Sequence, residues 1–479
     1  MENEAKLTQI GKVDLKRFVV QSALLSLIDP VRGEPTRSLL DEDPDGISSI
    51  RQQLKKKFLD AFALICSTAG SGAKTASAVC LEQYASSGAI LRVARNHGLT
   101  PEDQAGLERV LQILQAVAEK GKYILNYAKH FLKTADTATN TDRSSTQAEA
   151  DILNLIVQLD RGRILSLAEK VEKRGIQVLL RQAPSKPVTH QDNSETSAEL
   201  DFRLWLEKCP FRALPSQTWN SATVALLIDW ASQARWIYSE QLQNLLGLHQ
   251  SEKPLWLKNL HKIARYRSAI KSMVKLAVKE PDVFTDIRIQ GVMAPGTSSF
   301  SLTGEKKPLL AVVKNAVRED LEMTMEKLEK HLETQDIEAR LRRSCRLDLT
   351  LHAEMQLVVF YEGNPEHLPR MLFIGTSKKA CFLCHRYLLK HQLRLQVSAC
   401  HQKIYPSWMP PPYYPLPRQY KSLAFVKLAR EIEQLMKKDL KTALTAPRRP
   451  RNYDSTAGPS LTQTATVSLE LSSVQAIEN

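Results

Sequence analysis

Four residues in the last third of the chain have the types and spacing of a catalytic metal site. His352 and Glu354 form a His-Ala-Glu motif, and Cys381 and Cys384 form a later Cys-x-x-Cys pair. One imidazole and two thiolates would give a zinc ion three protein ligands and leave the fourth tetrahedral position for water. Zinc lowers the pKa of bound water, so that hydroxide becomes available near neutral pH. Glu354 would be the free carboxylate that moves protons at that water.

These residues need particular elements to bring them together. His352 and Glu354 are two positions apart, so in mid-helix they would point to nearly opposite sides. We therefore expect a helix to start here, with an N-cap offered by residues 348–350. Residues 371–374 predict a short buried strand. The two cysteines would then lie on the first turn of the next helix, where the helix N-terminus favours the thiolate form.

Three segments around these motifs resemble a known family. Residues 351–357, 374–384 and 401–408 are similar to the deaminase-like family that is widespread in filamentous fungi and belongs to the zinc-dependent cytidine deaminase superfamily. H-x-E followed by P-C-x-x-C is the signature of zinc nucleobase deaminases. Ala380 stands where many members have proline before the first cysteine, a departure that changes the expected pocket floor but not the ligands.

The resemblance implies an enzyme with zinc as its cofactor and a nucleobase, free or within nucleic acid, as its substrate. Zinc-bound hydroxide would attack the amino-bearing ring carbon. The implied site consists of three metal ligands, His352, Cys381 and Cys384, and one proton shuttle, Glu354. Tyr405 and Trp408 are candidates for a pocket wall, although ordinary aromatic packing explains them equally well.

Other interpretations of the same motifs stay open. A fourth protein ligand from His385, Cys400 or His401 would make the zinc site closed and structural. Cys-x-x-Cys-His also matches the attachment pattern of c-type haem, and Cys-x-x-Cys alone can be a redox pair. At the level of function, the alternatives are a catalytically inactive, zinc-stabilised helical interaction protein and a nucleic-acid-binding module without catalysis.

The remainder of the chain predicts an α/β domain preceded by a mainly helical region. We expect helical regions at 1–135 and 149–280 separated by a linker at 134–148, a three-layer α/β/α cytidine-deaminase-like domain at 281–445 and a disordered tail at 446–479. Within the third range, alternation predicts a hairpin of strands at 284–289 and 308–313, a long helical stretch at 315–342 and a strand at 393–397.

Composition limits the partners and the compartment. The 479 residues carry a formal net charge of +14, which favours association with polyanions such as nucleic acid. Seven scattered cysteines indicate a reducing compartment rather than a disulfide framework. With no apolar leader and no long apolar run, we expect no membrane association and a cytoplasmic or nuclear location. Protein partners of the helical region cannot be read from the sequence.

The sharpest basic segment is 253–279, where lysines and arginines are interleaved with Trp256 and Tyr266. Aromatic side chains among basic ones can stack on bases. The apolar residues of the segment recur at helical spacing, however, so an amphipathic helix with a solvated basic face is the competing interpretation. A second basic cluster, Arg448–Arg451, is a candidate for nuclear import or nucleic-acid contact.

Overall fold

The computed structural model describes most of the chain. The described residues are 7–41, 46–68, 74–84, 88–130, 136–173, 175–182, 196–212, 215–248, 253–317, 320–334, 336–414, 422–442 and 444. The expected tail at 446–479 and the cluster Arg448–Arg451 lie outside them. Among the described residues, none of the helices has the length and apolarity needed to cross a membrane.

A mixed five-stranded sheet is the centre of the structure, with the strand order β3-β2-β1-β6-β7. Its strands are β1 (Ser77–Tyr84), β2 (Gly88–Arg95), β3 (Ile287–Gly291), β6 (Phe373–Thr376) and β7 (Gln396–Val397). β1 is antiparallel to both β2 and β6, and the outer strands β3 and β7 run parallel to their neighbours. Val79 is paired with Val93 on one side and with Gly375 on the other.

Helices cover both faces of this sheet. Along β1, Val79 and Leu81 point into one core while Ala78 and Cys80 point into the other, as the two-residue period of a strand requires. The first core is shared with α2 (Gly46–Ile65), α3 (Pro101–His130), α4 (Asp136–Lys173), α7 (Ser221–Trp236) and α9 (Leu255–Lys279). The second is shared with α1 (Lys12–Ile28), α13 (Ala353–Gly363), α14 (Phe382–Lys390) and α15 (Leu423–Thr442). The result is a layered, mostly helical α/β structure.

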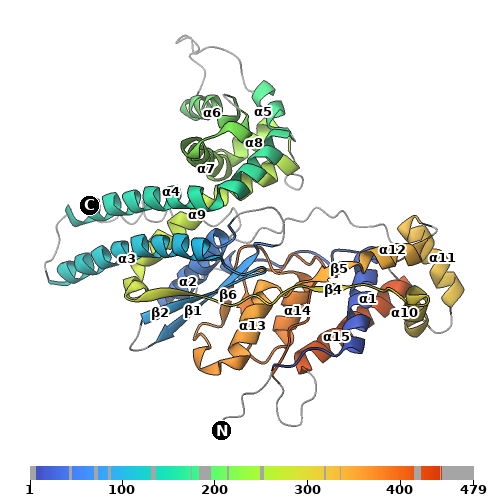
Figure 1. Ribbon diagram of the computed structural model, residues 1–479. Coiled ribbons are helices and arrows are strands. Elements are labelled where there is room, and N and C mark those ends of the chain that lie inside the picture. Colours follow the sequence, from blue (N-terminus) through green and yellow to red (C-terminus); the bar gives the residue numbers. More distant parts are fainter. Residues whose placement is uncertain are drawn as a thin grey trace, which may run out of the picture.

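The remaining elements lie at the periphery. In Figure 1, α5–α8 gather at one end of the long helices α4 and α9, away from the sheet. A small antiparallel sheet pairs β4 (Ser298–Phe300) with β5 (Leu347–Leu349). The other helices are α5 (Ile176–Gln182), α6 (Ser197–Glu207), α8 (Ser239–Leu245), α10 (Pro308–Ala316), α11 (Leu321–Leu332) and α12 (Ile337–Ser344). The short 3₁₀ segments are Leu39–Asp41, Pro210–Arg212, Ser216–Thr218, Pro281–Phe284 and Pro365–His367.

Two expectations about the first 148 residues are wrong. The range 1–135 is not only helical, because it supplies β1 and β2, which form a hairpin and occupy the middle of the sheet. Residues 136–148 are not a linker but the start of α4, a helix of 38 residues. Its later turns pack on α3 and α9, and such tertiary packing extends a helix through residues of weak helical propensity.

The expected hairpin in the third range is also wrong. Residues 308–313 form α10, with Pro308 in the first helical turn, where its fixed φ and missing N–H are tolerated. β3 starts at Ile287, after a 3₁₀ turn at 281–284, and pairs with β2 instead. The helical stretch expected at 315–342 is present as α11 and α12, and the strand expected at 393–397 is reduced to its last two residues. The range 281–445 therefore supplies three of the five strands rather than a complete sheet, and the proposed domain boundaries remain predictions.

Candidate metal centre

His352 sits at the N-cap of α13, with φ −66° and ψ 151°, just before the helical backbone begins. Residues 348–350 were expected to cap this helix. They lie instead at the end of β5 and just after it, before the helix begins. The side chain of Asn96, which follows β2, accepts a hydrogen bond of 2.8 Å from the Ala353 N–H. The Gln356 side-chain amide donates to the carbonyls of Arg95 and Leu351 at 3.1 and 2.9 Å. The end of β2 therefore fixes the start of α13.

Cys381 and Cys384 occupy the start of α14, as the sequence predicts. Cys381 is the N-cap residue, and its sulfur accepts a 3.3 Å hydrogen bond from the Cys384 N–H. Both side chains are buried. The loop before them is held by the carbonyl of Ala399, which accepts from the Ala380 N–H at 2.9 Å. An N–H directed at sulfur at a helix N-terminus stabilises negative charge on that sulfur.

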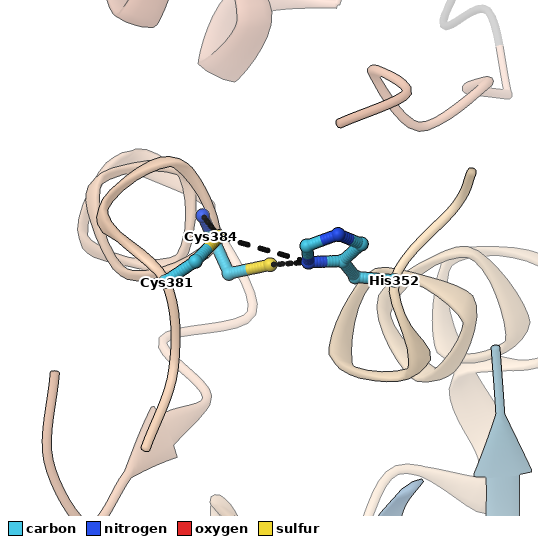
Figure 2. Close-up of side chains that lie close together, drawn as sticks. All are labelled: His352, Cys381 and Cys384. Carbon is cyan, nitrogen blue, oxygen red and sulfur yellow. Dashed lines mark hydrogen bonds between the residues drawn. The ribbon is translucent and has the colours of Figure 1, made fainter. Parts of the chain in front are cut away.

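The two helix starts bring His352 and both cysteines into one cluster, shown in Figure 2. The Nδ1 atom of His352 is 3.6 Å from the Sγ of Cys381 and 3.4 Å from the Sγ of Cys384. With Zn–S bonds of about 2.3 Å and a Zn–N bond of about 2.0 Å, a tetrahedral ion would separate nitrogen from sulfur by about 3.5 Å. The donor atoms thus fit a metal ion of this size, and the cluster is consistent with a zinc site.

Of the three candidate ligands, Cys381 carries the negative charge that favours a cation. Burial raises the pKa of the Cys381 thiol, but hydrogen bonding with Cys384 and the charge of His352 outweigh burial and bring the pKa well below its usual value. Burial would lower the pKa of His352, and the neighbouring Cys381 thiolate overcomes this effect and raises it. A thiolate is the form that ligates a metal, and a dication binding here would release protons from the cluster.

Glu354 lies beside the cluster without being part of it. Its Oε2 is 3.8 Å from the Sγ of Cys384, and its side chain is half-buried. Burial raises the pKa of this carboxyl group, which places it closer to the range useful for proton transfer near neutrality. His352 and Glu354 do converge, because His352 is in extended backbone and Glu354 in the first helical turn.

The segment 398–409 crosses both helix starts and brings two aromatic residues to the centre. Trp408 is fully buried, and its Nε1–H donates a 3.3 Å hydrogen bond to the Sγ of Cys384. Trp408 therefore holds the sulfur of a candidate ligand, Cys384, through this hydrogen bond. Because it is fully buried, it does not form the pocket wall that was one of the two interpretations of its position in the sequence. Tyr405 is 38% exposed, with its ring 6.3 Å from the ring of His352. This position agrees with a wall residue at an accessible site.

A fourth protein ligand is not found in the part of the chain that the structure describes, since none of its other His, Cys, Asp or Glu residues joins the cluster. Cys400 instead accepts a hydrogen bond from the Gln402 N–H. Nδ1 of His401 accepts from the Lys403 N–H at 3.0 Å, and burial lowers the His401 pKa to about 4. His385 is also outside the cluster, and burial lowers its pKa. If these three residues of the described chain bound a zinc ion, the fourth tetrahedral position would remain for water or substrate.

The role of Asn96 was not predicted from the sequence, and of the two alternatives left open for Trp408, a pocket wall or aromatic packing, its full burial agrees with packing. Asn96 precedes α13 by more than 250 positions, and nothing in its local sequence shows that it contacts Ala353. Residues 255–279 of the basic segment form α9, and Trp256 and Tyr266 are buried at 4% and 1% exposure. Both rings are thus packed in the core, as the amphipathic-helix interpretation expects, but the basic face is only partly solvated because Arg265 is buried as well. Contact of this segment with a polyanion stays a prediction.

Comparison with known families gives one match. The family described as "OTT_1508_deam:-like deaminase" matches residues 351–412, a span that contains His352, Glu354, both cysteines and Trp408. The match covers well under half of the chain, so it identifies a deaminase-like segment and not the whole protein. The fungal character expected from the resemblance is not shown by this match. Comparison with curated proteins and with solved structures finds no match.

Proposed function

We propose that the protein is a zinc-dependent hydrolytic deaminase of a nucleobase, with His352, Cys381 and Cys384 as ligands and Glu354 as the proton shuttle. The observation that carries the proposal is the cluster itself, in which nitrogen-to-sulfur separations of 3.4 and 3.6 Å suit tetrahedral zinc. The deaminase family match over 351–412 and the helices on both faces of the sheet support it. The layered structure agrees with a three-layer cytidine-deaminase-like fold.

The chemistry assigned to the chain's own residues is proton transfer. When bound, zinc would supply a Lewis acid that brings the pKa of water close to neutrality. Glu354 would take one proton from the attacking water at its carboxylate and pass it to the adjacent ring nitrogen. It would then move the remaining hydroxyl proton to the amino group, which departs as ammonia while the ring carbon becomes a carbonyl. The raised pKa of Glu354 suits both halves of this transfer. Tyr405 would flank the base.

The alternative of a closed structural zinc site is disfavoured by one observation. Cys400, His401 and His385, the residues close enough in sequence to complete such a site, all lie outside the cluster. A half-buried glutamate beside the ligands is also more useful to a catalytic site than to a structural one.

Metal content is the first test. We expect about one zinc per chain in the wild-type protein and its loss in Cys381→Ala and in Cys384→Ala, measured by elemental analysis after purification with zinc supplied. Cys345→Ala is the matched control, because Cys345 is also fully buried but lies outside the cluster. A wild type without zinc would contradict the proposal.

Activity is the second test. Wild-type protein is incubated with cytosine and adenine as free bases, nucleosides and single-stranded oligonucleotides, and ammonia is measured. We expect release from at least one of these substrates, and Glu354→Gln to reduce it by roughly 10²–10⁴-fold while keeping its zinc. Equal ammonia release by wild type and Glu354→Gln would remove the proposed role of Glu354.

A further inference from the structure

Lys378, in the loop that leads to Cys381, lies near three other basic residues that come from two helices. Arg163 and Lys170 are on α4, Lys262 is on α9, and Lys378 is in the loop between β6 and α14. Lys170 is exposed and the other three are half-buried. We call these four residues the basic rim. Lys262 belongs to the basic segment 253–279 noted in the sequence, and the other three residues lie outside it.

Packing explains how the rim is assembled. The Nη1 of Arg265 is 3.4 Å from the carbonyl oxygen of Ser377, which fastens α9 to the loop that leads to Cys381. Lys262 is one helical turn before Arg265, and Lys378 directly follows Ser377, so this contact brings the two lysines to the same region.

The contribution of α4 comes from two residues on one helix face. Arg163 and Lys170 are seven positions apart, which is two helical turns. α4 packs along α9, and Nη1 of Arg163 donates to the Ser67 carbonyl at 3.0 Å. Arg163 is thus held in place by the end of α2, while Lys170 remains accessible.

The charges of the rim act on one another and on the cluster. The pKa of Lys378 is lowered to about 8, first by burial and then by the positive charges of Arg163, Lys262 and Lys170. The positive charge of Lys378 also acts on His352, where it lowers the imidazole pKa. The rim is therefore one positively charged region that borders the metal-binding cluster, and positive charges gathered in this way attract a polyanion.

We propose that the basic rim binds the phosphates of a single-stranded nucleic acid whose base enters the site beside Glu354. The proposal rests on the proposed function, since a site for a nucleobase makes a phosphate-linked base the matching polyanion. A base must leave its stack before an enzyme can deaminate it, and this favours a single strand over a duplex as the substrate. Tyr405, 38% exposed beside His352, offers a ring on which such a base can stack.

Binding is tested separately from catalysis. A fluorescein-labelled, mixed-sequence single-stranded DNA of about 15 nucleotides is titrated with full-length Glu354→Gln protein, and anisotropy is followed at several salt concentrations. Adding Lys170→Glu and Lys262→Glu should weaken binding at least about ten-fold and lower the salt slope by about 1.4, the value for two lost phosphate contacts on a single strand. Circular dichroism checks that each variant is folded.

The matched control places the same two charge reversals elsewhere. Lys120 on α3 and Lys441 at the end of α15 are both exposed, and Lys120→Glu with Lys441→Glu should change the affinity much less. The same DNA annealed to its complement is titrated alongside. Absence of binding, equal weakening by the control pair, or tighter binding of this duplex would each overturn the proposal. Zinc content and ammonia release are measured in separate experiments. A failure of the proposed function can therefore be told apart from a failure of phosphate binding by the rim.

Discussion

The indole of Trp408 lies behind Cys384, and its Nε1–H donates a 3.3 Å hydrogen bond to the cysteine sulfur. The ring is fully buried between Phe18 of α1 and Tyr387 of α14, at centroid distances of 5.6 and 6.0 Å. Its orientation is therefore fixed by packing. A hydrogen bond to a ligating sulfur from a fixed donor orients that ligand and tunes its charge.

Trp408→Phe should therefore weaken metal binding while keeping most of the aromatic packing. Loss of a hydrogen bond that supports a ligand typically costs 10–100-fold in metal affinity, and we expect at least roughly ten-fold here. Competition with a chromophoric zinc chelator measures the affinity. Trp236→Phe is the control, because it also removes an indole donor, to Ser268 at 3.0 Å, but away from the cluster. Unchanged affinity in Trp408→Phe would show that the bond does not support zinc binding.

Short motifs predicted the candidate site well because each depends on local geometry. The start of α14 at Cys381 is capped by the cysteine's own sulfur, within the motif, whereas the start of α13 at His352 also depends on the distant Asn96. The strand between them, expected at 371–374, is displaced by two residues to Phe373–Thr376. Such a displacement is ordinary for element ends, which local sequence specifies least well.

The arrangement of the sheet was not predictable in the same way. β1 pairs with β6 through Ala78 and Thr376, residues that are almost 300 positions apart. No local pattern reports such a pairing, so residues 77–95 were assigned to a helical region. The position of Asn96 against α13 depends on this pairing and was missed for the same reason.

Asn96→Ala should loosen the start of α13. The variant leaves the Ala353 N–H without its acceptor in a buried position, where an unsatisfied donor costs about 1–3 kcal/mol. We expect a loss of that size in the free energy of unfolding, measured with urea, together with weaker zinc binding. Asn220→Ala removes the N-cap of the distant helix α7 and should cost about 1 kcal/mol without affecting zinc. Equal zinc affinity in both variants would contradict the positioning role of Asn96.

Gly375→Ala should destabilise the contact between α2 and β6. A Cβ at this position would lie 2.3 Å from the carbonyl carbon of Leu59, and because that atom belongs to the backbone of α2 it has little room to move away. Overpacking of this kind costs about 1–3 kcal/mol, which urea unfolding would detect. Gly291→Ala, in the edge strand β3, is the control, since its Cβ would meet only Leu99 at an ordinary 3.6 Å. A variant at Gly375 as stable as the control would show that α2 can shift freely.

Asp60 should make stability depend on pH. It is 3% exposed, and burial raises its pKa from 3.8 to about 6 despite a hydrogen bond from the Thr376 N–H. Because the folded protein holds this proton more tightly than the unfolded chain, the stabilisation is complete below about pH 4 and is lost as the pH rises through about 6. The unfolding free energy of wild type minus that of Asp60→Asn should therefore fall by about 2 kcal/mol between about pH 4 and 7. Urea unfolding measures the difference, with the exposed Asp201→Asn as control, and a difference that stays constant with pH would refute the assignment.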